Sequence, residues 1–432
     1  MTSNTDINTQ ANKMASDFAA VSDVFSGSAD SDPYPFFRQL RETTPVMEGD
    51  ILAHFGVPSQ ADYGNKGRQV FTTFRYEDCM AILRDPQTFT SGLLMDGLGA
   101  FLEDAMLTAL DGETHRSLRN TLQGAFTPKN VKYWHENLIA PVIVDEFVKP
   151  LLARKQCDLV NDFALNFPVR VIYEMMGFPN DPEAIEQFAG WALRILAGPQ
   201  PDPEKAKQSM AAAFQAAQDL YDHVKPIVAA RRARGDHSGG DLISHLLRAD
   251  AEGAALDDHK ITNIVRMLLP AAAETTTRSF SNMMVLLLDR PELLAQIRDD
   301  RKLVPKAINE SLRYEPVSAF LAREAAEDVE IGGVKIPKGA AISLANGSAN
   351  RDEAMFVNGE EFDINRPLKP ILSFGFGPHT CLGLAIAKME MESALNAVLD
   401  HMPNLRYDPA YPKAEIVGVT MRGPRAVNVI FD

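Results

Sequence analysis

Phe374-Gly375-Phe376-Gly377-Pro378-His379-Thr380-Cys381-Leu382-Gly383 places one cysteine in a glycine-rich loop just before a predicted helix. Because glycine has no Cβ, the loop backbone can bring N–H groups close to the sulfur. The helix start adds unpaired N–H donors and the positive end of the helix dipole. Both effects favour the thiolate, which is the form of cysteine that binds metal. The loop therefore predicts a metal ligand of the kind that haem iron accepts at an axial position.

This run closely resembles the haem-binding loop of the cytochrome P450 family, with the phenylalanine, the glycines, the histidine and the cysteine in register. The match continues into the next helix, at Ala385, Ala387, Lys388 and Glu390. The resemblance implies that Cys381 is the iron ligand and that Phe374, Gly375 and Gly383 help to hold the haem. The alternative is a buried structural cysteine, which is the usual state of a free cysteine. A match this dense argues against that alternative.

A long helix is predicted from Asp257 or Asp258 to about Asp289, because apolar residues recur at helical spacing. About thirty residues at a rise of about 1.5 Å would span roughly 45 Å, which is enough to cross a domain. Pro270 lies inside this helix, where it removes one backbone hydrogen bond and clashes with the carbonyl of Arg266. The sequence therefore predicts a kink near Pro270.

Directly after this proline the chain reads Ala271-Ala272-Ala273-Glu274-Thr275-Thr276. In the resembling family an acid and an alcohol lie on the oxygen-binding side of the haem, and Glu274 and Thr275 match them residue by residue. A threonine hydroxyl can donate and accept hydrogen bonds there, and a carboxylate can resupply protons. The alternative is an ordinary helix with an exposed Glu274 and a Thr275 bonded to its own preceding turn. Ala272, expected against the haem, stands where glycine is commonest, and Pro270 is not a usual feature of the family.

Residues 305–314 are predicted to form a helix that Pro316 ends. Glu310 and Arg313 are three residues apart on it and share a face. They match the Glu-x-x-Arg pair of the family, which implies a buried structural ion pair near the cysteine loop. The simpler alternative is an exposed salt bridge worth a few tenths of a kcal/mol. Apolar neighbours on the same helix favour the buried pair.

Four basic residues are expected, by the same resemblance, to bind the haem propionates. His115 and Arg119 are one helical turn apart and match the family's His-x-x-x-Arg motif, and Arg323 and His379 match two further propionate ligands. A guanidinium pairs well with a carboxylate, which suits arginine to this role. Each residue alone could be a solvated surface charge, but the four belong together with Cys381.

The composition is that of an acidic globular protein. The 432 residues carry a formal net charge of −15, which argues against a nucleic-acid-binding protein. The three cysteines, Cys79, Cys157 and Cys381, give neither a four-thiolate cluster nor a disulfide framework. A reducing, cytoplasmic compartment is therefore expected. We find no apolar run near the N-terminus long enough for a signal peptide or a membrane anchor.

Helical patterns dominate from about residue 102 to 314, with β-rich segments on both sides. The patterns predict helices at 36–43 and 78–83, strands at 68–74 and 341–345, a hairpin at 329–336, and two strands within 417–431. Residues 1–32 are predicted to be a flexible lead-in and residues 33–432 a single catalytic domain. The expected fold is mainly α with small β-sheets (α+β), as in the cytochrome P450 fold. The haem would lie between the long kinked helix and the helix after the cysteine loop.

The resemblance implies a haem-thiolate monooxygenase that contains haem b and inserts one atom of O₂ into a small or medium hydrophobic substrate, by hydroxylation or O-dealkylation. A monomer that takes electrons from a separate ferredoxin and its reductase is expected, because the length leaves no room for a flavin or iron–sulfur domain. A basic docking patch is expected at Arg116, Lys129, Lys132 and Lys388. The residues expected to line the substrate pocket are Met95, Phe101, Leu102, Met267, Ala271, Val317, Phe320 and Leu321.

Other functions remain open at the level of sequence. A peroxide-driven peroxygenase on the same fold would lack the acid–alcohol pair. A non-catalytic haem-binding protein would need neither a proton relay nor a large apolar pocket, and a haem-free helical interaction protein would need no iron ligand. Each residue expected in the pocket could equally belong to the core.

Overall fold

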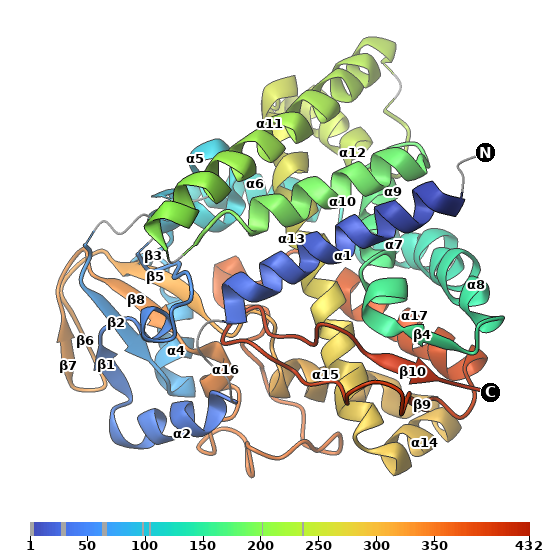
Figure 1. Ribbon diagram of the computed structural model, residues 1–432. Coiled ribbons are helices and arrows are strands. Elements are labelled where there is room, and N and C mark those ends of the chain that lie inside the picture. Colours follow the sequence, from blue (N-terminus) through green and yellow to red (C-terminus); the bar gives the residue numbers. More distant parts are fainter. Residues whose placement is uncertain are drawn as a thin grey trace.

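The computed structural model describes residues 4–26, 32–62, 67–96, 99–102, 105–200, 202–235 and 237–432 (Figure 1). Helices dominate it. The α-helices are α1 (Asn4–Ser26), α2 (Tyr34–Thr43), α3 (Ile51–His54), α4 (Tyr76–Arg84), α5 (Gly99–Leu102), α6 (Gly112–Gln123), α7 (Pro128–Trp134), α8 (Lys149–Leu152), α9 (Phe167–Met175), α10 (Pro182–Leu196), α11 (Pro203–Arg234), α12 (Leu242–Ala249), α13 (Asp258–Leu288), α14 (Pro291–Asp299), α15 (Val304–Tyr314), α16 (Asn346–Ala349) and α17 (Leu384–His401).

Within the described residues, three small sheets accompany the helices. Their strands are β1 (Val46–Glu48), β2 (Val70–Thr73), β3 (Phe89–Thr90), β4 (Gln156–Asp158), β5 (Leu321–Ala325), β6 (Val329–Ile331), β7 (Val334–Ile336), β8 (Ala341–Leu344), β9 (Arg406–Tyr407) and β10 (Asn428–Ile430). One sheet has the order β1-β2-β8-β5-β3, with β2 and β8 parallel and the other neighbours antiparallel. The others are β4-β10-β9 and the hairpin β6-β7. The expected mainly α fold with small sheets is confirmed.

Helix α13 runs through the middle of the molecule, where α9, α11, α15 and α17 pack against it (Figure 1). Asp257 caps its start, because the carboxylate accepts a hydrogen bond from the N–H of Lys260 at 2.8 Å. Most of its residues are buried, as expected of a helix that other elements surround. Pro270 lies inside the continuous helix, and the kink expected there stays a prediction.

The N-terminal segment differs from the expectation. Asn4–Ser26 forms helix α1, where a flexible lead-in was predicted, and it packs along α10 (Figure 1). The physical reason is an apolar stripe within a polar segment: Met14, Phe18 and Val21 are buried in the main core, at the spacing of one helix face. Residues 1–3 and 27–31, also part of the predicted lead-in, lie outside the described residues.

The tail also differs. Two strands were predicted within 417–431, but this part of the chain forms a single isolated bridge between Val417 and Gly423 and then strand β10. Strand β10 pairs with β4 and with β9, two segments that the sequence patterns did not single out. The hairpin β6–β7 is confirmed, since Gly332 and Gly333 both have positive φ angles (56° and 81°), which glycine adopts at little cost.

Candidate active site

The cysteine loop is held in a backbone conformation that favours glycine at two positions. Gly375 and Gly377 have φ angles of 66° and 71°. A Cβ on Gly377 would lie 2.5 Å from the carbonyl oxygen of Leu83, so α4 packs directly against the loop backbone. The N–H of Cys381 donates to the carbonyl of Phe374 at 2.8 Å and closes the loop. These contacts fix where the sulfur points before α17 begins.

The Cys381 thiol has opposing influences on its pKa. Burial among the loop atoms raises the pKa, while the N–H groups of Gly383 and Leu384 and the charge of Arg119 lower it. Burial has the larger effect, so the protein groups alone do not produce the thiolate that the sequence pattern suggested. Metal binding itself requires and stabilises the deprotonated form. The residue as a whole is still solvent-exposed, so the thiol can reach a metal although the loop atoms around the sulfur exclude much of the water.

Helices α13 and α17 are joined close to the acid–alcohol pair. Thr276 Oγ1 donates to Glu390 Oε2 at 3.0 Å, and both side chains are buried. Glu390 has few groups to stabilise its charge in this dry position, so burial raises its pKa to about 8. The contact places the start of α17, and with it the cysteine loop, against the middle of α13.

The acid of the pair is buried, in contrast to the exposed glutamate of an ordinary amphipathic helix. Glu274 is 1% exposed, and Arg278 Nε donates to its Oε1 at 2.6 Å. Burial raises the pKa of Glu274, while the charge of Arg278 and its hydrogen bond lower it. The alcohol is half-buried, and Thr275 Oγ1 donates to the carbonyl of Ala271 at 2.9 Å. Thr275 thus has the local bond expected of an ordinary helix, while its oxygen can still accept a hydrogen bond.

The basic residues predicted to bind propionates form a cluster. The rings of His115 and His379 lie 4.1 Å apart, and His379 Nε2 lies 3.2 Å from Asp111 Oδ1. Burial lowers the pKa of Arg323 to about 10. Burial and the nearby charges of His379, Arg119 and Arg323 lower the pKa of His115 to about 4.

This cluster fits an anionic group. His115 Nε2 is buried without a hydrogen-bond partner among the described residues, and the bond from Arg323 Nη1 reaches only the adjacent carbonyl of Ala322. Buried cations normally require compensating anions, and Asp111 is a single carboxylate beside several bases. Two propionates would supply the missing negative charge. Arg119 acts electrostatically on Cys381 as well, which ties the cluster to the cysteine loop.

The family model for cytochrome P450 matches residues 66–403. The chain belongs to the cytochrome P450 family. Pulcherriminic acid synthase of Bacillus subtilis is 30% identical over 429 residues, which cover 96% of this P450 and 98% of that protein. Cyclomarin C epoxidase CymV of Salinispora arenicola is 32% identical and covers 84% of this chain and 91% of its own.

Solved P450 structures agree with the fold. CYP109E1 from Bacillus megaterium in complex with testosterone has a TM-score of 0.79 at 27% identity, covering 93% of this chain and 98% of its own. Cytochrome P450 CREJ in complex with (4-ethylphenyl) dihydrogen phosphate has a TM-score of 0.79 at 30% identity, covering 95% and 98%. As a member of this family the protein is an oxidoreductase of the monooxygenase class and binds haem b. Among the described helices, none is long and apolar enough to span a membrane.

The residues expected in the substrate pocket of this P450 lie in different environments. Phe320 packs on Phe37, with ring centroids 5.6 Å apart, in the core beneath α2. Val317 and Leu102 are buried, whereas Ala271 is exposed. The remaining side chains, those of Met95, Met267 and Leu321, are half-buried. The sulfur of Met267 accepts a hydrogen bond from the Leu107 N–H at 3.3 Å. The side chain of Phe101 lies outside the described residues.

The Glu-x-x-Arg pair is buried, as the apolar neighbours on its helix suggested. Arg313 Nη2 and Nε donate to the two oxygens of Glu310 at 2.7 and 2.8 Å. Arg313 also donates to the carbonyls of Asn350, Gly359 and Glu361, in the segment that leads to the cysteine loop. The pair therefore acts as scaffold for the loop.

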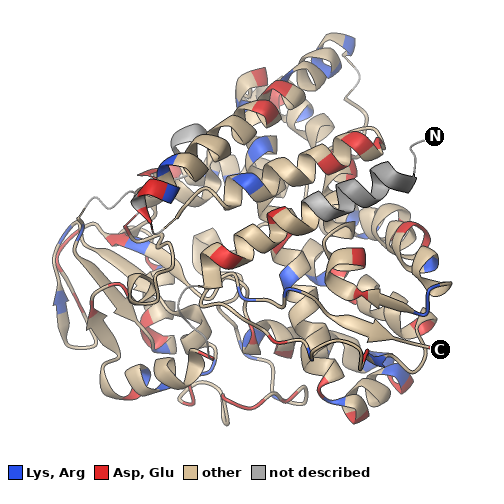
Figure 2. Ribbon diagram, in the orientation of Figure 1, with Lys and Arg blue, Asp and Glu red and all other residues tan. Residues whose placement is uncertain are grey.

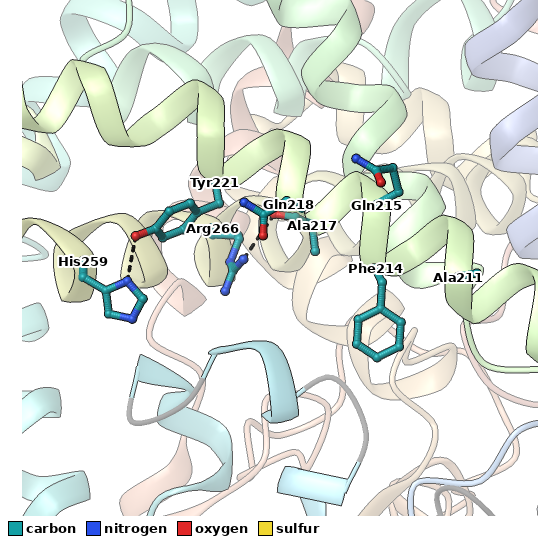
Figure 3. A pocket seen from close by; sticks show the side chains of 8 residues that line it. All are labelled: Ala211, Phe214, Gln215, Ala217, Gln218, Tyr221, His259 and Arg266. Atoms are coloured by element: carbon teal, nitrogen blue, oxygen red, sulfur yellow. Dashed lines mark hydrogen bonds between the residues drawn. The ribbon is translucent and has the colours of Figure 1, made fainter.

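A pocket of about 710 Å³, lined by both polar and apolar side chains, lies between α11 and α13 (Figure 3). Tyr221 and His259 are hydrogen-bonded across it at 2.7 Å, and Arg266 donates to the carbonyl of Ala217 at 3.2 Å. It includes no residue of the cysteine loop, the acid–alcohol pair or the basic cluster. We therefore do not assign it to the haem site.

Two residues of the site were missed in the sequence. Glu390 was noted only as part of the family match, yet it is the buried carboxyl that joins α17 to α13. Arg278 was not singled out, although its position four residues after Glu274 is a recognised signal for a helical ion pair. Spacing alone could have found Arg278, but not the burial of the pair.

The predicted docking patch is less basic than expected. Figure 2 shows acidic and basic residues interspersed along the described helices. Arg116 pairs with Glu113 on α6 at 2.5 Å, and Lys132 pairs at 3.7 Å with Glu136, in the π-helical segment that follows α7. Lys388 is half-buried and donates to Asn309 Oδ1 at 2.6 Å.

Proposed function

We propose that this P450 inserts one atom of O₂ into a small or medium hydrophobic organic substrate, by hydroxylation or O-dealkylation, with electrons from a ferredoxin and its reductase. Residues 33–432 would act as one catalytic domain and as a monomer. The free, buried thiols of Cys79 and Cys157 suit a reducing compartment such as the cytoplasm. The hydrophobic substrate class is supported by the solved relative that holds testosterone.

The observation that carries the proposal is the buried Glu274 next to Thr275 in the middle of α13. Glu274 is buried beside one charged partner and next to an alcohol, an arrangement in which an acid can pass protons through hydrogen bonds, and burial and Arg278 shift its pKa in opposite directions. A peroxide-driven enzyme would have no use for such a relay. When bound, haem b supplies the activation of O₂.

The protein's own residues have separable tasks in this scheme. Cys381 would ligate the iron, with Phe374, Gly375 and Gly383 shaping the loop around it. His115, Arg119, Arg323 and His379 would neutralise the propionates and fix the plane of the ring. Ala272 would leave room for the ring at α13, and Thr275 and Glu274 would bind and transfer protons beside it. Ala271 and Met267 would exclude water and contact the substrate.

Turnover of a Thr275→Val variant tests the role of the pair. A substrate would first be found by screening hydrophobic compounds for a Soret shift of the purified holoenzyme. The product formed per reductant oxidised should then fall by at least about ten-fold with a ferredoxin system, because the proton-transferring hydroxyl is lost. Turnover with peroxide alone should fall much less.

Thr262→Val is the matched control, since Thr262 Oγ1 also donates to a carbonyl four residues earlier on α13, at 2.6 Å. Its product yield should equal that of the wild type. If Thr275→Val and Thr262→Val behave alike, the proposed role of Thr275 is wrong. If the reduced protein with CO fails to give the strongly red-shifted Soret band, the thiolate role of Cys381 is wrong.

A further inference from the structure

Arg278 connects the predicted catalytic acid to the N-terminal helix. Its Nη2 lies 2.5 Å from Oε1 of Glu274 and donates to Ser22 Oγ on α1 at 3.0 Å. Its guanidinium carbon lies 4.6 Å from the centroid of the Phe18 ring, also on α1. A single guanidinium therefore contacts both the distal acid and a helix that lies 256 residues earlier in the chain.

All four side chains are shielded from water. Glu274 and Arg278 are each 1% exposed, Phe18 2% and Ser22 3%. In so dry a site the charge of Arg278 is barely screened, and its lost hydration is offset only by the groups that touch it. A Cβ on Gly423 would lie 3.1 Å from Arg278 Cγ, so the C-terminal segment also closes over the stem of the arginine.

The contacts from α1 fix one of many possible arginine conformations. A free arginine side chain has many rotamers and loses that conformational entropy when it is ordered. The Phe18 ring offers a cation–π face that orients the guanidinium plane. The Ser22 hydroxyl donates to the Phe18 carbonyl at 3.0 Å, which leaves its lone pairs directed at Arg278. Helix α13 alone supplies neither contact.

Only one carboxylate oxygen of Glu274 accepts a hydrogen bond from the described residues. Oε1 accepts from Arg278, whereas Oε2 is buried without a hydrogen-bond partner among the described residues. The direction of Oε2 is set by how firmly Oε1 is held. An acid that transfers protons needs such a fixed direction, since proton transfer depends on hydrogen-bond geometry.

We propose that α1 contributes to the catalytic site. Phe18 and Ser22 on α1 fix the position of the Arg278 guanidinium, and this guanidinium orients the Glu274 carboxylate and stabilises its negative charge. Phe18, Ser22 and Arg278 are positioning residues, because they act through Glu274. The inference rests on the proposed function, in which Glu274 supplies protons.

The electrostatics of the site support this arrangement. Burial raises the pKa of Glu274, and Arg278 is the charged group that lowers it. In the described part of the chain, the other elements around the pair offer no second cation. Helix α1 contacts Arg278 through the uncharged Phe18 and Ser22, and the C-terminal segment contacts it through the backbone of Gly423. On α17 the nearby acid is Glu390, which is bonded to Thr276. If Arg278 were held less firmly, it would oppose the effect of burial less, and the pKa of Glu274 would rise.

The test compares Ser22→Ala and Phe18→Leu with Ser26→Ala in the full-length holoenzyme. Ser26 is the matched control, because its hydroxyl donates within α1, to the carbonyl of Ser22 at 2.6 Å. The Glu274 carboxyl band is titrated by infrared difference spectroscopy and assigned by its loss in Glu274→Gln. The titration midpoint should rise by about half a pH unit or more in Ser22→Ala and Phe18→Leu and stay unchanged in Ser26→Ala.

Product yield provides the second measurement, with the CO spectrum checking that each variant retains its haem site. Ser22→Ala should lower the product formed per reductant in the wild type but add nothing in a Glu274→Gln background, as a double-mutant cycle requires. Midpoints in Ser22→Ala and Phe18→Leu that match Ser26→Ala would overturn the inference. A Glu274→Gln variant with normal yield would instead overturn the proton-transfer role of Glu274, even if the infrared midpoint shifts.

Discussion

Two buried carboxyls on neighbouring helices differ because of a single partner each. Glu274 faces the Arg278 guanidinium, which opposes the effect of burial on its pKa. Glu390 receives the Thr276 hydroxyl, which lowers its pKa too little to offset burial. The local sequence shows the two acids equally clearly, but only Glu274 has a cation at i+4 on its own helix face, because Lys388 is two residues from Glu390 and points from another face.

The titration of Glu390 makes stability depend on pH. Its pKa rises from an ordinary value of about 4.5 to about 8 in the folded protein. Folding thus favours the neutral form of Glu390. This stabilisation is complete below a pH of about 4.5 and is lost as the pH rises from there through about 8. Glu390→Gln should therefore reduce the loss of stability between pH 5 and pH 8 by at least about 1 kcal/mol, measured by thermal unfolding.

The exposed Glu392 on the same helix provides the control. Glu392→Gln should leave the difference in stability between the two pH values unchanged, because its carboxyl is in water in both states. A Glu390→Gln variant that loses as much stability as the wild type over this range would show that Glu390 ionises normally in the folded protein.

At the scale of the element, the cysteine loop depends on its neighbours as much as on its own sequence. Three glycines indicated a tight loop, and the positive φ angles of Gly375 and Gly377 account for two of them. The approach of the Leu83 carbonyl to Gly377 could not be foreseen, since α4 lies nearly three hundred residues earlier in the chain. The same holds for helix α15, whose Arg313 binds three carbonyls on the way to the loop.

Gly377→Ala should disrupt the loop through a backbone clash. The new Cβ would lie 2.5 Å from the Leu83 carbonyl, so α4 and the loop must separate. We expect a loss of stability of at least about 2 kcal/mol in thermal unfolding, together with faster loss of haem to an apomyoglobin acceptor.

Gly339→Ala is the control that separates the effect of the Leu83 clash from the cost of placing alanine at a positive φ angle. Gly339 has a φ of 83°, similar to that of Gly377, but nothing lies within 4 Å of its added Cβ. It should lose only about 1 kcal/mol and retain haem normally. Equal effects of the two substitutions would mean that the Leu83 contact does not constrain the loop.

At the scale of the whole molecule, the net charge of −15 leaves few positions where a negatively charged protein could dock. Of the four basic residues expected to form the patch, Arg116 and Lys132 have acidic partners and Lys388 is half-buried. Electrostatic steering acts on the summed field, so paired lysines still contribute to association.

Charge reversal on α7 tests this surface. Lys129→Glu combined with Lys132→Glu should slow reduction by a ferredoxin several-fold at low salt and weaken the salt dependence of the rate. Lys335→Glu, on the exposed hairpin β6–β7, serves as the control and should leave the rate unchanged. Identical rates and salt dependence in the double variant and the wild type would place the docking surface elsewhere.

The sequence by itself predicted Cys381 as the iron ligand, and it determined the long helix, the Glu-x-x-Arg helix and the glycine hairpin. Each is encoded by residues close together in the chain, where spacing and backbone preference suffice. Tertiary structure alone decided that Asn4–Ser26 packs as a helix, that Phe320 joins the core on Phe37, and that Ser22 and Arg278 meet. Those outcomes depend on which distant surfaces bury each other, because an apolar stripe or a charge shows that a partner is needed without showing which one.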